Sequence, residues 1–442
     1  MRIGIIGGGA AGMAAAYELS LRGHSCQVFE IAPFLGGQAS TFMIGNSPLE
    51  RGYHHLFRSD QSMIDLMSEL EIQDKLQWID SNVGYFSSDR LWPFTSPFDL
   101  LKFKPLSFFD RVRLGITTLK LQRMKSWEDL ESITAVEWLV KNLGERIYTI
   151  IFEPILRGKF GKYYDQITMA WLWNKFALRT ASRGKGLLGR FKEQLGYPLG
   201  SFDVIFDSLK TKIQEAGGEV HTRSRIEKIR VVQNKATGLD ISLENGKSEF
   251  REYDAILSTT PSYVFTQLVD GLSKEYVSKL TDKSYLSAVL VILVLDRPLM
   301  PHYWVYVGDR NMPFLGIIEH TNLIDSTNYG DQHIVYLTNY LEKEDRLYKL
   351  DSEQLLAEYL PHLKSINHDF NESWVLDYHL HKVDAAQPIV TINYRDKIPP
   401  HRTTIKGLYL ANTTQIYPED RGTNYSVRMG REVAGMIDSD FE

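Results

Sequence analysis

A glycine-rich turn close to the amino terminus constrains this chain more than any other feature. Residues 7–12 read Gly-Gly-Gly-Ala-Ala-Gly; they follow the apolar run 2–6 and lead into a stretch with helical spacing up to residue 21. The next apolar run, 25–29, has the composition of a second strand. Strand, glycine turn, helix and strand in this order predict a βαβ unit that binds a dinucleotide.

Each glycine of this G-x-G-x-x-G pattern has its own physical task. Gly7 makes the tight turn, Gly9 lets the backbone approach a pyrophosphate, and Gly12 lets the helix pack closely on the strand. We expect the pyrophosphate at the helix N-terminus, beside Ala10 and Ala11, because unpaired N–H groups there favour negative charge.

An acidic residue stands where such a motif needs one. Glu30 ends the second predicted strand, and its carboxylate can accept hydrogen bonds from ribose hydroxyls. A second G-x-G-x-x-G pattern, at 184–189, has neither a preceding apolar strand nor a following acid, so we interpret it as a loop. One dinucleotide site argues against a reductase with separate FAD and NAD(P)H domains.

The chain is too long for one compact core. Single cores stop growing near about 250 to 300 residues, so a chain of 442 residues predicts two domains or two interleaved lobes. The α/β pattern breaks off and resumes twice. We therefore predict an α/β fold, with a Rossmann-like dinucleotide-binding lobe of discontinuous segments interleaved with a mixed α+β substrate lobe. The predicted bounds are 1–60, 196–270 and 390–442 for the dinucleotide-binding lobe, and 61–195 and 271–389 for the substrate or cap lobe.

Composition excludes several classes of protein. The balance of 50 Lys+Arg against 55 Asp+Glu gives a formal net charge of −5, which offers nucleic acid no chain-wide attraction. Cys26 is the only cysteine, which excludes an intramolecular disulfide and a cysteine-rich metal site, and we predict no metal. The chain has no signal-peptide pattern and no apolar run of about 18 residues, so we expect a cytoplasmic protein.

Four further segments extend the motif along the whole chain. Residues 36–38 read Gly-Gly-Gln and 50–55 read Glu-Arg-Gly-Tyr-His-His. Residues 217–220 read Gly-Gly-Glu-Val, and 407–412 read Gly-Leu-Tyr-Leu-Ala-Asn ahead of Gly-Thr-Asn at 422–424. Together with the amino-terminal motif, these segments resemble the superfamily of flavin-containing amine oxidases, protoporphyrinogen oxidases and phytoene desaturases.

The resemblance implies one FAD that both ends of the chain hold along its length. It assigns an adenine contact to the backbone of Val220 and a position near the flavin to His54. It also implies a helix that starts after Gly422 and directs its positive end at the flavin edge, where reduced flavin accumulates negative charge. The residues expected at the cofactor are Gly7, Gly9, Ala10, Ala11, Gly12, Glu30, Gly36, Gly37, Gln38, His54, Val220, Asn412, Arg421, Gly422, Thr423 and Asn424.

Two positions depart from the family pattern. Gln38 stands where relatives often have Arg, and Asn412 stands where an acid commonly binds the ribityl or pyrophosphate region. Pyrophosphate binding is then expected to depend on backbone N–H groups and on Arg421. No cysteine lies near the carboxyl terminus, so we expect the FAD to be bound non-covalently.

The resemblance predicts a FAD-dependent oxidoreductase that transfers a hydride between a largely apolar small molecule and flavin N5, with oxygen, a quinone or another electron acceptor. No side chain is assigned to catalysis; the weak candidates are His54, His55 and Tyr417, since histidine titrates near neutrality and Tyr417 flanks the predicted flavin edge. One alternative is a non-redox isomerase that resembles UDP-galactopyranose mutase. Another is a binding protein that resembles Rab GDP-dissociation inhibitors, which the intact glycines and Glu30 disfavour.

A basic stretch remains outside this assignment. Residues 101–125 contain seven basic residues against Asp110 alone, a balance of +6, with aromatic and apolar residues between them. This mixture suits peripheral contact with an anionic membrane. A solvated basic helix face explains the same mixture, and we favour that reading from the sequence alone.

Overall fold

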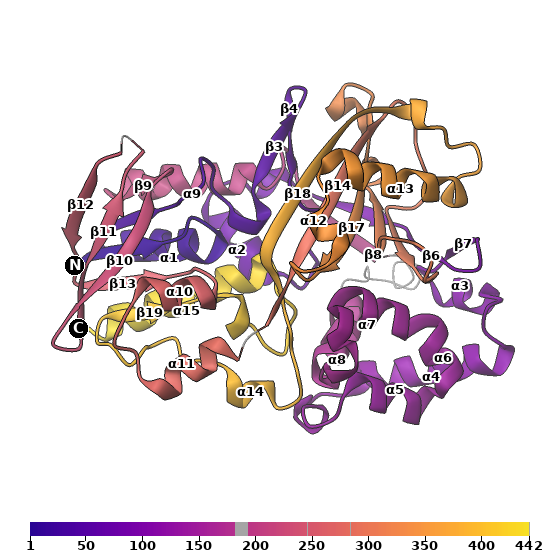
Figure 1. Ribbon diagram of the computed structural model, residues 1–442, viewed down its shortest axis with the longest axis horizontal. Coiled ribbons are helices and arrows are strands. Elements are labelled where there is room, and N and C mark those ends of the chain that lie inside the picture. The colour runs from indigo at the N-terminus through magenta and orange to yellow at the C-terminus, as the bar shows by residue number, and fades with distance from the viewer. Residues whose placement is uncertain (182–192, 245, 283, 442) are drawn as a thin grey trace.

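The computed structural model describes residues 1–181, 193–244, 246–282 and 284–441 (Figure 1). The second glycine pattern, at 184–189, lies outside these residues. Two large sheets organise the described chain, and a group of helices packs beside the second sheet (Figure 1). No described helix is both long and apolar enough to cross a bilayer.

The first sheet has five parallel strands with the amino-terminal strand at its centre, in the order β19-β13-β1-β2-β9. A parallel sheet is covered on both faces, which explains why β1 is almost wholly apolar. The bounds are Arg2–Ile6 for β1, Ser25–Phe29 for β2, Glu219–His221 for β9, Ala255–Ser258 for β13 and Leu408–Leu410 for β19.

Helices cover one face of this sheet, and a small antiparallel sheet covers the other. Ile3 and Ile5 pack against the helices, whereas Ile6 and Phe29 pack against the antiparallel sheet. The helices are α1 (Ala10–Leu21), α9 (Asp203–Glu215) and α15 (Thr423–Ser439). The opposite cover consists of β10 (Arg225–Val232), β11 (Lys235–Ser242) and β12 (Ser248–Glu252), with α10 (Ser262–Leu268) and α11 (Lys274–Thr281).

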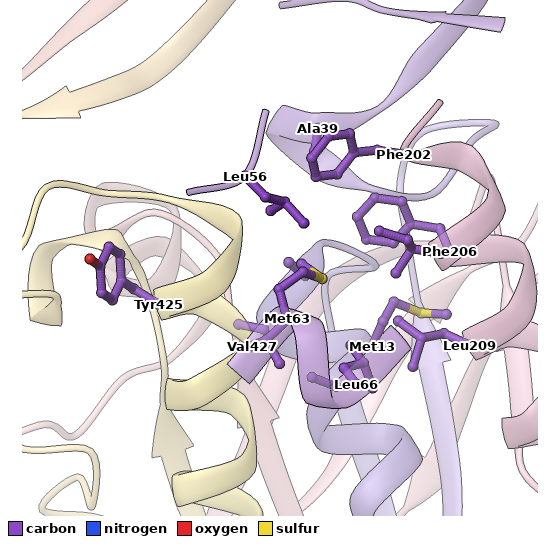
Figure 2. Packing of buried hydrophobic residues seen from close by; sticks show 14 of the residues in the cluster. Met13, Ala39, Leu56, Met63, Leu66, Phe202, Phe206, Leu209, Tyr425 and Val427 are labelled. Atoms are coloured by element: carbon purple, nitrogen blue, oxygen red, sulfur yellow. The ribbon is translucent and has the colours of Figure 1, made fainter. Parts of the chain in front are cut away.

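A short helix, α2 (Gln61–Glu69), joins the three helices of the first face. Its Met63 and Leu66 lie between Met13 of α1, Leu209 of α9 and Val427 of α15 (Figure 2). All five side chains are almost completely buried. This apolar contact holds α1 and α15, which lie far apart in the sequence, in one fixed arrangement.

The second sheet has seven strands in the order β18-β14-β17-β16-β15-β6-β7. Alternate residues of its long inner strand β14 face opposite sides: Leu290 and Ile292 face the first sheet's helical layer, while Val289 and Val291 pack against α13. The bounds are Tyr285–Leu295 for β14, Trp304–Val307 for β15, Gly316–Glu319 for β16, His333–Leu341 for β17, Val375–Pro388 for β18, Val83–Phe86 for β6, Leu91–Pro93 for β7 and Ser352–Ile366 for α13.

The helical group forms a third apolar core beneath the second sheet. Three of its helices begin with a Ser or Thr whose side chain accepts the N3 backbone N–H, at Ser96, Ser107 and Thr134. Each cap marks the point where a loop that contains Pro or polar residues ends and the helix begins. The group comprises α3 (Pro97–Lys102), α4 (Phe108–Arg123), α5 (Ala135–Leu143), α6 (Glu145–Ile147), α7 (Glu153–Phe160) and α8 (Met169–Ala181).

Shorter elements connect these bodies. They are β3 (Thr41–Ile44), β4 (Ser47–Glu50), β5 (Leu76–Ser81), β8 (Glu193–Pro198), α12 (Arg346–Lys349) and α14 (Tyr394–Lys397). The hairpin β3–β4 rises from the first sheet toward the second (Figure 1).

The predicted α/β class with a Rossmann-like sheet is confirmed. The strands of the parallel sheet lie at 2–29, 219–258 and 408–410, within the three segments that we assigned to the cofactor lobe. The exact bounds of the two lobes stay a prediction.

Candidate active site

Two glycines of the amino-terminal turn are required by the protein itself. Gly7 has a φ of +108°, and a Cβ atom there would lie 2.4 Å from Thr259 Oγ1. A Cβ atom at Gly12 would lie 2.0 Å from the carbonyl oxygen of Gly7, so any larger residue would push helix α1 away from the turn. Both positions therefore accept only glycine without a shift of the backbone.

Two other glycines are not required by the protein. Gly9 precedes α1 with a φ of −81°, and a Cβ atom there would only touch Gly37 Cα, at 3.7 Å. Gly422 precedes α15 in extended backbone, and a Cβ atom there would meet the Tyr425 ring at 3.4 Å, an ordinary contact. Backbone geometry and packing would tolerate alanine at both positions, so the space beside each glycine is open.

The two helices that begin at these glycines lie side by side (Figure 1). Ala11 contacts Gly430 near one end, and Arg22 Nη1 donates to Asp438 Oδ2 at 3.0 Å near the other, so the helices run parallel. From these contacts and a rise of about 1.5 Å per residue, α15 begins about 9 Å beyond the start of α1. Neither helix receives a side-chain hydrogen bond at its N-cap from the described residues. The positive ends of the two helix dipoles therefore point in the same direction, and α15 begins about 9 Å further along that direction than α1.

The residues around the glycine turn are held by backbone contacts. The Glu30 carboxylate accepts hydrogen bonds from the N–H groups of Gly8 (2.7 Å) and Ala32 (2.8 Å). Gly36 N–H donates to Gly8 O at 2.9 Å, which brings the segment 36–38 against the turn. Val220 lies on β9 opposite Val28 of β2, close to the strand end that carries Glu30. The structure thus brings these predicted residues together near the carboxyl ends of the parallel strands.

Two predicted cofactor residues are already bonded to protein. Asn412 donates from Nδ2 to Thr260 O (3.0 Å), and its Oδ1 accepts from Thr414 N–H (3.1 Å). Asn424 Oδ1 accepts from Met63 N–H at 3.0 Å and so caps helix α2. Both side-chain amides hold neighbouring segments in place, and their contact with a cofactor stays a prediction.

His54 and His55 are adjacent in sequence but lie in two different environments. His54 Nδ1 lies 2.5 Å from Gly52 O, a distance that requires a proton on Nδ1. Burial and, to a smaller extent, the positive charge of Arg421 lower the pKa of His54 to about 4, so the ring is neutral near pH 7. His55 turns away and lies 3.1 Å from the Tyr303 hydroxyl.

Tyr417, the third weak catalytic candidate, lies in the helical core. Its ring packs against Trp127 at 5.2 Å and Tyr394 at 5.4 Å between ring centroids. Burial raises the pKa of its phenol, which disfavours proton transfer by this group near neutrality. These contacts indicate a packing role, while a catalytic role for any of the three candidates stays a prediction.

A buried charge cluster that the sequence did not reveal lies just before α15. The Asp420 carboxylate accepts from Lys159 Nζ at 2.8 Å and Lys175 Nζ at 2.5 Å. Trp171 Nε1 and Gln387 Nε2 complete its shell at 3.2 and 3.3 Å. Burial opposes ionisation of Asp420, but the two ammonium groups outweigh it and hold the pKa of the carboxyl well below its usual range. Burial lowers the pKa of Lys175 to about 8, against the attraction of Asp420.

Arg421 connects the predicted cofactor segments to the second sheet. It donates from Nη1 to Gln38 Oε1 (3.0 Å), from Nη2 to the Tyr340 hydroxyl (2.8 Å), and from Nε to Gln387 Oε1 (3.3 Å). Burial alone would raise the pKa of Tyr340, but the charges of Arg421 and Lys159 outweigh it and lower that pKa. The Arg421 side chain points toward the second sheet, and its predicted role at the pyrophosphate stays a prediction.

Comparisons with known proteins place this geometry in a family. The profile of the flavin-containing amine oxidoreductases matches residues 10–434. The chain belongs to this family. It is similar to 15-cis-phytoene desaturase of Glycine max, with 24% identity over 93% of this chain and 75% of the desaturase.

Two solved structures share its fold. One is a protein from Exiguobacterium sp. 255-15 described as a putative protoporphyrinogen oxidase, with a TM-score of 0.78, 18% identity and coverage of 99% of both chains. The other is reduced UDP-galactopyranose mutase, with a TM-score of 0.75, 16% identity, and coverage of 99% of this chain and 95% of that one.

The chain is therefore a flavin-dependent oxidoreductase of the amine oxidoreductase family, as the sequence motifs predicted. The described residues fit a flavin, because Gly9 and Gly422 leave room beside two helix N-termini without side-chain caps. The same residues contain no cluster of three or more His, Cys, Asp or Glu side chains that could hold a metal ion.

Proposed function

We propose that this member of the family binds one FAD non-covalently along α1 and α15 and oxidises or reduces a largely apolar small molecule. The observation that carries the proposal is the pair of parallel, uncapped helices that begin at Gly9 and Gly422. When bound, FAD supplies the N5 atom that accepts or donates a hydride from a substrate C–H bond. The start of α1 would hold the pyrophosphate and the start of α15 the electron-rich edge of the ring.

The chemistry of the single cysteine supports non-covalent binding. Cys26 lies in β2 with no exposed surface, and burial raises the pKa of its thiol to about 11. A buried, protonated thiol is a poor nucleophile and cannot reach a ligand at the helix ends. The cofactor is then expected to leave the protein on denaturation.

Aromatic side chains beside the charge cluster support a largely apolar substrate. Tyr53 packs edge-on against Trp304 at 4.8 Å and near Tyr336 at 6.1 Å between ring centroids. Trp304 in turn packs against Tyr306, also on β15. Such surfaces contribute binding energy to apolar groups, with a small number of polar contacts left for orientation.

The cofactor proposal is tested with a pair of alanine variants. The purified chain should be yellow, and acid precipitation should leave FAD in the supernatant. Gly9→Ala should weaken FAD binding at least about tenfold, because the added methyl occupies the space reserved for the pyrophosphate. Thermal unfolding of the cofactor-free variant should be unchanged, since the fold leaves room there.

Gly115→Ala is the matched control, because a Cβ atom at this α4 glycine meets nothing within 4 Å. It should retain full FAD affinity. A colourless protein that cannot be reconstituted, or full affinity in Gly9→Ala, would refute the proposed cofactor site.

The reaction class is tested by anaerobic mixing with candidate amines, tetrapyrroles, polyisoprenoids and nucleotide sugars. In an oxidoreductase, the substrate itself bleaches or restores the flavin absorbance stoichiometrically. Turnover of a nucleotide sugar only after dithionite reduction, with no net oxidation, would assign the chain to isomerisation instead.

We also propose that α3 and α4 contact an anionic membrane. Seven large apolar side chains are exposed on these helices, and Phe109 is 82% exposed. On α4 the exposed ones recur with helical spacing and form a stripe opposite the buried Leu114 and Leu121. They are Phe98, Leu101, Phe108, Phe109, Val112, Ile116 and Leu119.

Cations border this stripe and favour a lipid partner over a second protein. Lys102, Lys104, Lys120 and Arg123 are all exposed on or next to α3 and α4. An apolar stripe with flanking basic residues is the pattern of a helix that lies in a membrane interface. Because these apolar side chains are exposed, we now favour membrane contact over the solvated basic helix face that we favoured from the sequence alone.

Vesicle sedimentation tests this contact. The chain should co-sediment with phosphatidylserine vesicles at low salt and not with phosphatidylcholine vesicles. Replacing Lys102, Lys104, Lys120 and Arg123 by Gln should weaken binding more than about a hundredfold, at about 1 kcal/mol per cation. Phe109→Ser should also release the chain, whereas Phe250→Ser, at a 50% exposed residue on β12, should not. Equal binding to both vesicles, no binding, or a change in oligomeric state alone would refute it.

A further inference from the structure

The charge cluster beside α15 contains more cations than its acids can pair. Asp420 is surrounded by four donors, among them both Lys159 and Lys175. The next acid that acts on Lys175 is Asp60, whose carboxylate accepts from Phe57 N–H instead. One carboxylate at hydrogen-bond distance therefore serves two ammonium groups.

Arg421 adds a third cation, and its hydrogen-bond partners among the described residues are all neutral. Its guanidinium contacts the Tyr340 hydroxyl and the side-chain amides of Gln38 and Gln387. Within the described residues it forms no ion pair at 4 Å or less, although it lies next in sequence to Asp420. The acid that acts on the charge of Arg421 is again Asp420, so one carboxylate serves three cations. Buried cations are costly unless enough negative charge lies close to them, and the arrangement therefore favours an anionic ligand.

The lysines remain reachable. Lys159 keeps 21% of its side-chain surface exposed and Lys175 keeps 35%, whereas Asp420 keeps 7%. The two lysine side chains therefore retain surface that a ligand can contact, while the carboxylate that they share is enclosed. A ligand that enters here meets the cations and not the acid.

The position of the cluster connects it with the substrate. Lys159 and Lys175 come from α7 and α8 of the helical group, and Tyr340 comes from β17 of the second sheet. Arg421 precedes the uncapped start of α15 by two residues. A molecule that reacts beside that helix start must lie among these three bodies.

We infer that the cluster binds an anionic group, a carboxylate or a phosphate, of the otherwise apolar substrate. Arg421 and Tyr340 donate hydrogen bonds to it, and Lys159 and Lys175 supply the positive field. This inference rests on the proposed function, because it takes the start of α15 as the place where the substrate reacts. It narrows the substrate class to amphipathic acids and separates them from amines, which the cluster would repel.

Ligand titration tests the inference on the FAD-loaded protein. Benzoate and phenyl phosphate should perturb the flavin absorbance with saturation, and the tighter of the two identifies the preferred anion. Benzyl alcohol and benzylamine, of similar size, should bind at least tenfold more weakly. Equal affinity for the neutral alcohol and the two anions would overturn the inference.

Variants separate this site from the cofactor site. Lys175→Gln should weaken benzoate or phenyl phosphate at least tenfold while FAD content stays unchanged, and Arg421→Met should weaken the same anion further. Arg428→Met is the matched control, since Arg428 lies outside the cluster and pairs with Glu419 at 2.9 Å. Loss of FAD with Lys175→Gln would overturn the inference, because the cofactor would then be the anion. Should the chain hold no FAD, calorimetry with the same anions on wild type and Lys175→Gln still decides the inference, and only the proposed function fails.

Discussion

The buried carboxyl of Glu50 makes stability depend on pH in a direction that the structure defines. Glu50 ends β4 with no exposed surface; it accepts from the Tyr197 hydroxyl at 2.9 Å and from Phe202 N–H at 2.8 Å. Burial raises the pKa of Glu50 from 4.5 to about 7, although both hydrogen bonds act in the opposite direction. The folded chain therefore binds this proton more tightly than the unfolded chain does.

The sign and size of the effect follow from that difference. Because the folded-state pKa is raised, the stabilisation is fully present below pH 4.5 and is lost as the pH rises through about 7. A difference of about 2.5 pKa units corresponds to about 3 kcal/mol of unfolding free energy, most of it lost between about pH 5 and 8. Glu50→Gln keeps an acceptor for Tyr197 and Phe202 but cannot titrate.

Urea unfolding followed by tryptophan fluorescence measures this effect at about pH 5 and pH 8.5. The variant should be close to wild type at the lower pH and more stable by about 2 to 3 kcal/mol at the higher pH. Glu244→Gln is the control, since Glu244 is exposed and pairs with Arg223 at 2.8 Å; its difference from wild type should not change with pH. The same difference between Glu50→Gln and wild type at both pH values would refute the reasoning.

Three further predictions concern the amino-terminal half of the site. Gly12→Ala should destabilise the cofactor-free protein by about 1 to 3 kcal/mol and so lower its thermal unfolding midpoint, because the added Cβ would lie 2.0 Å from Gly7 O; an unchanged midpoint would contradict this. Glu30→Arg should weaken FAD binding in equilibrium titration, since a cation cannot accept from ribose or from the Gly8 and Ala32 N–H groups; equal affinity would move the adenosine site elsewhere. The Cys26 thiol should react with a chromogenic disulfide reagent only after unfolding, and fast reaction in the native protein would contradict its burial.

The spacing of glycine and apolar residues near the amino terminus was sufficient to predict the βαβ unit there. The strand, turn and helix around Gly7 and Gly12 depend on backbone requirements within a few residues, and the sequence expresses these directly as glycine. The Rossmann-like α/β fold was predicted on this basis, and the family was predicted from motifs along the whole chain; both are confirmed. The cofactor contacts themselves stay predictions.

The basic stretch before residue 125 shows an intermediate case. Its charge and aromatic content are visible in the sequence, but the orientation of α4 is not. Its apolar residues occupy two faces of one helix, and only packing against α5 and α8 decides which face is buried. Leu114 and Leu121 turn inward, which leaves Phe109 and Ile116 exposed.

The charge cluster depends on tertiary structure alone. Lys159, Lys175 and Asp420 meet across as many as 261 positions of sequence, and no local pattern marks the two lysines as partners of that acid. Short sequence motifs reflect the conformational requirements of the backbone at one turn. A buried ion cluster depends instead on how α7, α8 and the start of α15 pack together. Packing of distant elements removes water from these charged groups, and this desolvation shifts their pKa values. It also makes the unpaired cations costly and so favours an anionic ligand. Neither effect can be predicted from the sequence alone, because both depend on which distant residues pack together.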